Sequence, residues 1–166
     1  MNSGITPVIY YCNPNIYPRE EYEIRKNECT RYAQALGLEI VDADYDHENW
    51  LREVAGMENE PERGGRCLKC FKLRLLRTAQ FAAQRGIKVI TTTLASSRWK
   101  SLDQINEAGR WACEQTETPV IWWDQNWRKG GLQERRLQIL KEYDFYNQLY
   151  CGCEFSIRKD DQNKGE

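Results

Sequence analysis

The sequence predicts an α/β fold with a mainly parallel sheet and helices on both faces of that sheet. Strand-like and helix-like segments alternate four times along the 166 residues, and no connection between them carries a hairpin signal. The stretch Ile87–Leu94 is rich in β-branched residues without apolar–polar alternation, which is typical of a strand covered on both faces. We therefore expect a single domain over residues 1–157, followed by a polar tail over residues 158–166.

In the first half of the chain, two short strands alternate with helices. A strand is expected at residues 7–11, and a turn with two prolines separates it from a helix at residues 19–36, where Gly37 is a natural stop. A second strand at residues 38–43 runs into an acidic turn and then into a short helix at residues 47–56.

The second half repeats this alternation with longer helices. Gly86 is expected to end the first of these helices, and Ser101 or Asp103 can cap the second. In such a sheet the functional crevice lies beyond the carboxyl ends of the strands, so the loops there should carry the chemistry. The expected elements are a loop at 57–66, a helix at 67–85, a strand at 87–94, a helix from 101 or 103 to about 115, a strand at 119–124 and a helix at 132–150.

The charge balance and the rarity of histidine exclude several kinds of function. There are 24 Lys and Arg residues against 25 Asp and Glu, so contact with a nucleic acid needs a local basic patch. His47 is the single histidine beside seven cysteines, so a zinc site with several histidines is excluded, and His47 is expected as an exposed turn residue. The N-terminus resembles no secretory leader, and no apolar run approaches the roughly 20 residues of a membrane span. We therefore expect a cytoplasmic protein with no membrane partner.

Two closely spaced cysteine pairs are the first candidates for chemistry. Cys67 and Cys70 share one face at the start of a predicted helix, where the helix dipole favours thiolates. They could bind a metal, form a redox dithiol or be ordinary cysteines. Cys151 and Cys153 flank a glycine, and the small ring of a Cys-x-Cys disulfide is strained and easily reduced. This second pair could cycle between dithiol and disulfide, or it could simply be buried.

The remaining cysteines and two aspartates are expected to have mainly structural roles. Cys12, Cys29 and Cys113 fall within predicted elements and are expected in the core. Asp44 and Asp46 lie near the end of a predicted strand, where a carboxyl group could donate a proton or bind a metal. Asp46 also precedes a helix, so a capping role is the leading alternative.

Basic and aromatic side chains cluster in two of the loops that follow predicted strands. Cationic side chains neutralise phosphates and exposed rings stack on unpaired bases, so this combination suits a nucleic acid. A solvated surface with tryptophans in the core is the alternative. The residues are Arg98, Trp99, Lys100, Trp127, Arg128 and Lys129.

Six separated segments, taken together, resemble one known family. They are YYCNPNIYPREEYEIRK, DADYDHENW, EPERGGRCLKCFKLRL, TTTLASSRWKS, NWRKGG and YCGCEFS, and they extend from about Pro7 to Ser156. In this order and spacing they resemble the QueH-type epoxyqueuosine reductases. The resemblance implies a nucleotide-α-hydrolase (HUP-like) fold and reduction of epoxyqueuosine to queuosine at the tRNA wobble position, the last step of queuosine biosynthesis.

The same resemblance implies a cofactor and partners. It implies a 4Fe-4S cluster, leaves an additional iron open, and calls for a tRNA substrate and an electron donor that it does not identify. By this resemblance Cys67 and Cys70 match cluster ligands, whereas Cys151 and Cys153 match a redox-active pair.

One part of the family pattern is missing from this chain. Family members begin with a strand and a His-x-Cys-Cys-x-Pro-Cys loop, whose adjacent cysteines supply further cluster ligands, and a cluster generally has four. The chain as given is therefore expected to lack the first strand of the fold. Either the reading frame starts further upstream, which we favour, or the chain is a fragment that cannot assemble the cofactor alone. Two other functions stay open: a non-catalytic zinc or RNA-binding module with four thiolates in one site, and an inactive truncated remnant.

Overall fold

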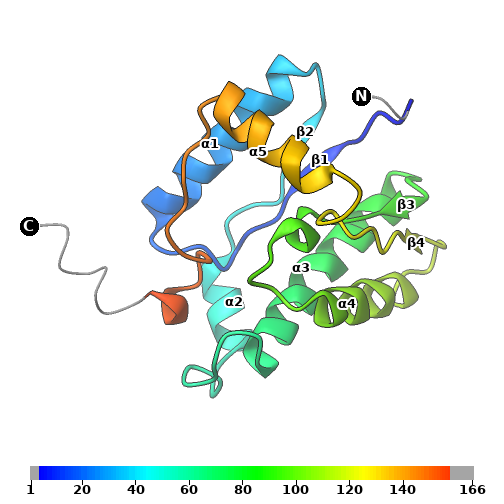
Figure 1. Cartoon of the computed structure of the whole chain (residues 1–166). Coiled ribbons are helices and arrows are strands. Elements are labelled where there is room, and N and C mark those ends of the chain that lie inside the picture. Colours follow the sequence, from blue (N-terminus) through cyan, green and yellow to red (C-terminus); the bar gives the residue numbers. More distant parts are fainter. Residues whose placement is uncertain (1–3, 158–166) are drawn as a thin grey trace, which may run out of the picture.

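A computed structural model of the chain describes residues 4–157 and confirms the α/β class (Figure 1). The expected polar tail at residues 158–166 lies outside the described residues. The elements are, in order, β1 (Ile9–Tyr11), α1 (Arg19–Ala35), β2 (Ile40–Asp42), α2 (His47–Glu53), α3 (Gly65–Gln84), β3 (Val89–Ile90), the 3₁₀ helix η1 (Thr93–Ser96), α4 (Leu102–Glu114), β4 (Ile121–Trp122), α5 (Leu132–Glu142) and the 3₁₀ helix η2 (Glu154–Ser156).

The strands form two small parallel sheets. β1 pairs with β2 and β3 pairs with β4, each in parallel, and within residues 4–157 no ladder joins the two pairs. A parallel pair needs a crossover connection, and α1 and α4 supply the two crossovers. The predicted parallel arrangement is therefore confirmed, in the form of two two-stranded sheets.

The largest core cluster lies where α3 and α4 pack against the β3–β4 sheet. Ile105, Ala108 and Ala112 of α4 are fully buried there. Gly109 lies between them, and a Cβ atom at this position would approach the indole ring of Trp122 to 2.3 Å. This glycine therefore lets α4 lie directly on the sheet.

The third predicted strand is much shorter than expected. Only Val89 and Ile90 pair, and Val89 is 47% exposed, so the prediction of a strand covered on both faces is wrong at this position. Just beyond, the hydroxyl oxygen of Thr92 accepts a hydrogen bond from the backbone N–H of Leu94 and begins η1. This local side-chain bond offers the backbone an alternative to the sheet.

The last predicted helix, at residues 132–150, is wrong over its second half. α5 ends at Glu142, and Asp144 has a positive φ of 47°. Arg31 donates a hydrogen bond to the Tyr143 carbonyl at 2.9 Å, and Phe145 packs edge-on against Tyr32 of α1. These contacts with α1 replace helical hydrogen bonds, and the chain then runs back along α1 toward α2 (orange, Figure 1).

No helix within residues 4–157 combines the length and the apolar character that crossing a membrane requires.

Candidate functional site

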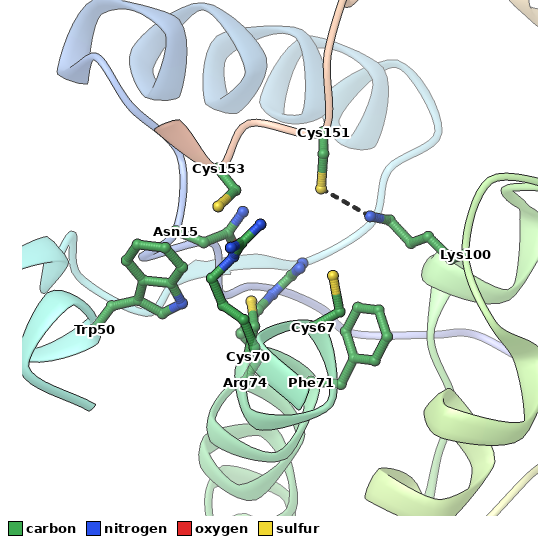
Figure 2. A pocket seen from close by; sticks show the side chains of 10 residues that line it. Asn15, Trp50, Cys67, Cys70, Phe71, Arg74, Lys100, Cys151 and Cys153 are labelled. Carbon is green, nitrogen blue, oxygen red and sulfur yellow. Dashed lines mark hydrogen bonds between the residues drawn. The ribbon is translucent and has the colours of Figure 1, made fainter. Parts of the chain in front are cut away.

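All four cysteines of the two predicted pairs line one narrow pocket of about 20 Å³. Cys67 and Cys70 come from the first turns of α3, whereas Cys151 and Cys153 come from the segment between α5 and η2. Figure 2 shows the two pairs on opposite sides of the pocket, with their sulfur atoms turned toward it. We call this space the thiol pocket.

The start of α3 is built so that it presents Cys67. The N-cap residue Gly64 has no capping side chain, and the carboxylate of Glu60 instead accepts from the backbone N–H of Arg66 at 2.9 Å. A Cβ atom on Gly64 would approach this carboxylate to 2.8 Å, so the glycine makes room for it. The backbone N–H of Arg63 then donates to the Cys67 sulfur at 3.3 Å.

Arg66 is buried beside the thiol pocket. Its Nη1 atom donates to three carbonyl oxygens of the preceding loop, those of Met57, Glu58 and Glu60, at 2.7–2.9 Å. Its Nε atom is buried and has no hydrogen-bond partner within the described part of the chain. The guanidinium therefore stabilises this loop through Nη1, and its Nε–H remains unpaired at the pocket.

Lys100 makes Cys151 differ from the other thiols of the pocket. Burial alone would raise the pKa of Cys151, but the Lys100 ammonium, 2.9 Å from the sulfur, and the nearby Arg74 lower it below its usual value. Burial instead raises the pKa of Cys70, and it raises that of Cys153 to about 12. Of the C-terminal pair, Cys151 is therefore the thiol that ionises more readily, and Cys153 keeps its proton at neutral pH.

A larger cleft of about 520 Å³ borders the thiol pocket and shares Cys67, Cys151 and Cys153 with it. Trp99, which is 65% exposed, and Tyr150 are among the residues that line the cleft. A space of this size is in the usual range for small-molecule sites. The thiols therefore lie at the edge of a cleft large enough for a nucleoside.

Two arginines hold the loop that carries Trp99 and Lys100. Arg63 donates to the carbonyl oxygens of Arg98 and Trp99 at 3.0 and 2.9 Å. Arg128 donates to the Lys100 carbonyl at 3.0 Å. The loop that holds Lys100 against Cys151 is therefore braced from both sides.

Comparison with known proteins places the chain in a family. A family model described as "Epoxyqueuosine reductase QueH" matches residues 1–159. The chain belongs to the QueH family. Among curated members, the proteins of Histophilus somni and Haemophilus influenzae named "Epoxyqueuosine reductase QueH" are each 49% identical over 98% of this chain. The protein of the same name from Acinetobacter baylyi is 46% identical over 94% of the chain.

This QueH-family chain is shorter than those relatives. It spans 65% of the length of the first two and 71% of the third.

The structure divides the six predicted nucleic-acid contacts into two groups. Arg98, Trp99 and Lys129 are exposed. The indole N–H of Trp127 donates to the Thr92 carbonyl at 2.9 Å, and Arg128 and Lys100 make the internal contacts described above. Three of the six side chains are thus occupied within the chain, and three are exposed.

Asp44 and Asp46 lie outside this QueH-family site. Both are exposed, and neither lines the thiol pocket or the cleft. Asp46 is the N-cap residue of α2, as the capping alternative predicted, although its side chain makes no capping hydrogen bond.

The expectation of an exposed His47 is wrong. The ring is largely buried, with one nitrogen 2.7 Å from the Pro14 carbonyl and the other 3.2 Å from the Glu154 carboxylate. It stacks on Tyr45 and Trp50. The stacking partners are neighbours in the sequence, but the partners of the two ring nitrogens, Pro14 and Glu154, come from separate segments that the sequence alone does not place beside His47.

The three cysteines expected in the core lie there. Cys12 is buried, and Cys29 and Cys113 are partly buried against separate apolar clusters.

Several residues of the pocket were missed by the reasoning from the sequence. Asn15 and Trp50 lie within segments that carry the family resemblance, but their residue types alone indicate no role. Arg66 directly precedes Cys67, which is the one local sign that it belongs to the site. The missed residues are Asn15, Trp50, Arg66, Phe71 and Arg74.

The pocket suits an anionic sulfur-rich group only in part. Within residues 4–157, no three His, Cys, Asp or Glu side chains lie close enough together to hold one metal ion. Within the same residues, three buried polar atoms at the pocket lack partners, namely Asn15 Oδ1, Trp50 Nε1 and Arg66 Nε. Two of these are N–H donors, which suit sulfide or thiolate acceptors. Within residues 4–157 the pocket thus offers four thiols and two unpaired N–H donors, but no complete set of metal ligands.

Proposed function

We propose that this chain is part of an epoxyqueuosine reductase, which converts epoxyqueuosine to queuosine at the wobble position of tRNA. The observation that carries the proposal is the meeting of two cysteine pairs, far apart in the sequence, at the edge of one cleft. The names of the QueH relatives support the same activity.

The reaction has a simple electron balance. Conversion of an epoxide to an alkene takes up two electrons and two protons and releases water. Oxidation of the Cys151 and Cys153 thiols to a disulfide releases two electrons and two protons, so one dithiol balances one turnover. A reductant from outside the chain must then restore the dithiol.

Lys100 has a role in this scheme because of its position. Its ammonium lies 2.9 Å from the Cys151 sulfur and lowers the pKa of that thiol, which favours the reactive thiolate form. Burial raises the pKa of Cys153 to about 12, so this thiol carries one of the two protons that the reaction takes up. Asp44 and Asp46 have no part in this proposal, since they line neither cavity.

The exposed side chains beside the cleft would hold the tRNA. Trp99, which is 65% exposed, offers an aromatic ring for an unpaired base, and the Arg98 guanidinium lies 5.2 Å from the centre of that ring. Arg98 and Lys129 offer charges for phosphates. An anticodon loop presents such bases already outside a duplex. Arg63 and Arg128 would contribute by holding the loop that carries Trp99.

The pocket can supply two of the thiolate ligands that an iron–sulfur cluster needs. Cys67 and Cys70 would hold it as two thiolate ligands, and Trp50 and Arg66 would donate hydrogen bonds to its sulfur atoms. When bound, a 4Fe-4S cluster supplies electrons one at a time. Within residues 4–157 no third side chain lies close enough to complete a metal site, so in this proposal further ligands would come from outside these residues.

The test replaces the two C-terminal cysteines singly with serine in the protein expressed from the extended frame. We expect Cys151→Ser and Cys153→Ser to abolish epoxyqueuosine reduction and to leave bound iron unchanged. Cys113→Ser, a partly buried cysteine at the α4 core, is the matched control and should keep its activity. Unchanged turnover in either C-terminal variant would refute the redox pair.

Anaerobic purification separates this proposal from the zinc-module alternative. Brown protein with iron and acid-labile sulfide supports the reductase. Colourless protein with one equivalent of zinc would replace it with the non-catalytic module.

A further inference from the structure

The backbone around the C-terminal cysteine pair is held from one side by α1 and the turn before it. Three consecutive carbonyl oxygens accept hydrogen bonds there. Arg25 Nη2 donates to Tyr150 O at 3.1 Å, and Nη1 donates to Cys151 O at 3.2 Å. The backbone N–H of Tyr17 donates to Gly152 O at 2.8 Å.

Arg25 is itself fixed by a buried ion pair. Its Nε atom lies 2.7 Å from Glu21 Oε1, and the two side chains are only 10% and 9% exposed. The other oxygen of Glu21 accepts from the Tyr146 hydroxyl at 2.8 Å. Each of the three guanidinium nitrogens therefore has its own acceptor, a geometry that the single nitrogen of a lysine cannot reproduce.

Fixing these carbonyl groups fixes the direction of the Cys151 side chain. The peptide planes on either side of a Cα atom are rigid, so their orientations set φ and ψ at that residue and thereby the direction of its Cβ atom. The carbonyls of Tyr150 and Cys151 belong to the two planes that flank the Cys151 Cα. Arg25 thus holds the two planes that direct this sulfur toward Lys100.

Gly152 permits this arrangement. Its φ of 106° lies in the left-handed region, and a Cβ atom here would approach Ile16 Cγ1 to 2.8 Å and Arg25 Nη1 to 3.1 Å. The backbone of the cysteine pair therefore lies flat against Ile16 and Arg25.

We infer that Arg25, oriented by Glu21, is a positioning residue that sets the direction of the Cys151 thiol and holds the backbone leading to Cys153 in place. A role of Arg25 in turnover rests on the proposed function. Its positioning of the Cys151 thiol does not, because it follows from contacts within this chain. Arg25 touches no reacting atom, and its effect passes through the backbone carbonyls.

Arg31 on the same helix provides a matched control. It also pairs with a glutamate, Glu28, at 3.0 Å, and it also donates to a carbonyl of the C-terminal segment, Tyr143 O, at 2.9 Å. It differs from Arg25 in being 49% exposed and in its acceptor, because Tyr143 lies eight positions before Cys151, whereas Arg25 bonds Tyr150 and Cys151 themselves. A general bracing of the C-terminal segment by α1 should depend on both arginines.

The experiment compares Arg25→Met, Arg25→Lys and Arg31→Met in the reduced, metal-free protein. Hydrogen exchange of the Tyr17 amide reports whether Gly152 is in place, because that amide donates to its carbonyl. Iodoacetamide labelling, resolved by mass spectrometry, reports the exposure of buried Cys153. Since Arg25→Met leaves Glu21 buried and unpaired, the double variant Glu21→Met/Arg25→Met keeps the test valid if the single variant unfolds.

We expect exchange of the Tyr17 amide and labelling of Cys153 to rise about tenfold in the Arg25 variants, as for the loss of one charged hydrogen bond. Arg25→Lys should not restore the wild-type values, and Arg31→Met should change neither. Unchanged local readouts in a folded Arg25 variant, or an equal effect of Arg31→Met, would overturn the inference. None of these readouts needs catalysis, so an inactive protein would count against the proposed function alone.

Discussion

The ammonium nitrogen of Lys100 lies 2.9 Å from the sulfur of Cys151, across 51 positions of the sequence. From the sequence, Lys100 belongs to a basic and aromatic cluster suited to phosphates. In the structure its charge is directed inward, to a thiol. This contact lowers the pKa of Cys151, whereas burial raises the pKa of Cys70 and Cys153.

Replacing Lys100 with methionine should suppress the reactivity of Cys151 in the metal-free protein. The ammonium holds the pKa of Cys151 below its usual value against the opposing effect of burial, so its removal should raise that pKa. We expect alkylation of Cys151 at neutral pH to become several-fold slower and its midpoint to move to higher pH. Site-resolved iodoacetamide kinetics over a range of pH measure both quantities.

Lys129→Met serves as the control for this prediction, because Lys129 is an exposed cation of the neighbouring loop. A Lys100→Met protein with wild-type Cys151 kinetics would show that the contact does not control the thiol.

Buried tyrosines should limit the stability of the chain at alkaline pH. Burial raises the pKa of Tyr11 and Tyr22, and it raises that of Tyr150 to about 12, whereas the unfolded value is 10.0. The folded chain keeps protons that the unfolded chain releases, so this stabilisation is fully present below pH 10.0 and is lost as the pH rises. Urea unfolding at increasing pH should show this decline.

Tyr22→Phe tests the alkaline prediction at one position. The variant loses the 2.6 Å hydrogen bond to Asp42, with an expected cost of about 1.5 kcal/mol at neutral pH. Its stability should then fall less steeply with pH, because one titrating phenol is gone. An unchanged slope would contradict the assignment of Tyr22.

Gly109→Ala should destabilise the chain despite the better helix propensity of alanine. The new methyl group would overlap the Trp122 indole at 2.3 Å, and overpacking of this kind costs about 1–3 kcal/mol. The propensity gain of about 1 kcal/mol offsets only part of this cost. In a Trp122→Leu background the same substitution should cost much less, and an equal cost in both backgrounds would place the strain elsewhere.

Gly152→Ala should loosen the C-terminal cysteine pair. The substitution combines a positive φ of 106° with a clash against Ile16, whereas Gly56→Ala combines a positive φ of 83° with open space. Faster iodoacetamide labelling of Cys153 is therefore expected in Gly152→Ala only. Equal labelling in the two variants would mean that backbone strain, rather than the close approach to Ile16, is the cause.

Local signals in the sequence account for much of the fold. Gly37 has the positive φ of 65° that its position after α1 suggested. Of the two predicted caps of α4, Ser101 is the one whose side chain accepts from the backbone, at Gln104 N. These features depend on a few neighbouring residues, so a local pattern is sufficient to find them.

Features that depend on distant contacts could not be found in this way. The early end of α5 depends on Arg31 and Tyr32, more than 100 positions away in the chain. The buried environment of His47 depends on Glu154 in the same way. For the site, spacing identified both cysteine pairs, but only the folded chain shows that they share one pocket and that Lys100 contacts one of them.

The two sides of the thiol pocket are synthesised at different times. Residue 151 follows residue 70 by 151 − 70 = 81 positions. At roughly 5–20 residues per second, Cys67 and Cys70 leave the ribosome about 4–16 s before Cys151, which faces them across the pocket. During that interval the first pair is an open dithiol on a nascent chain, available to oxidants and stray metal ions. The four thiols therefore come together in one pocket only late in synthesis, when the last segment docks along α1.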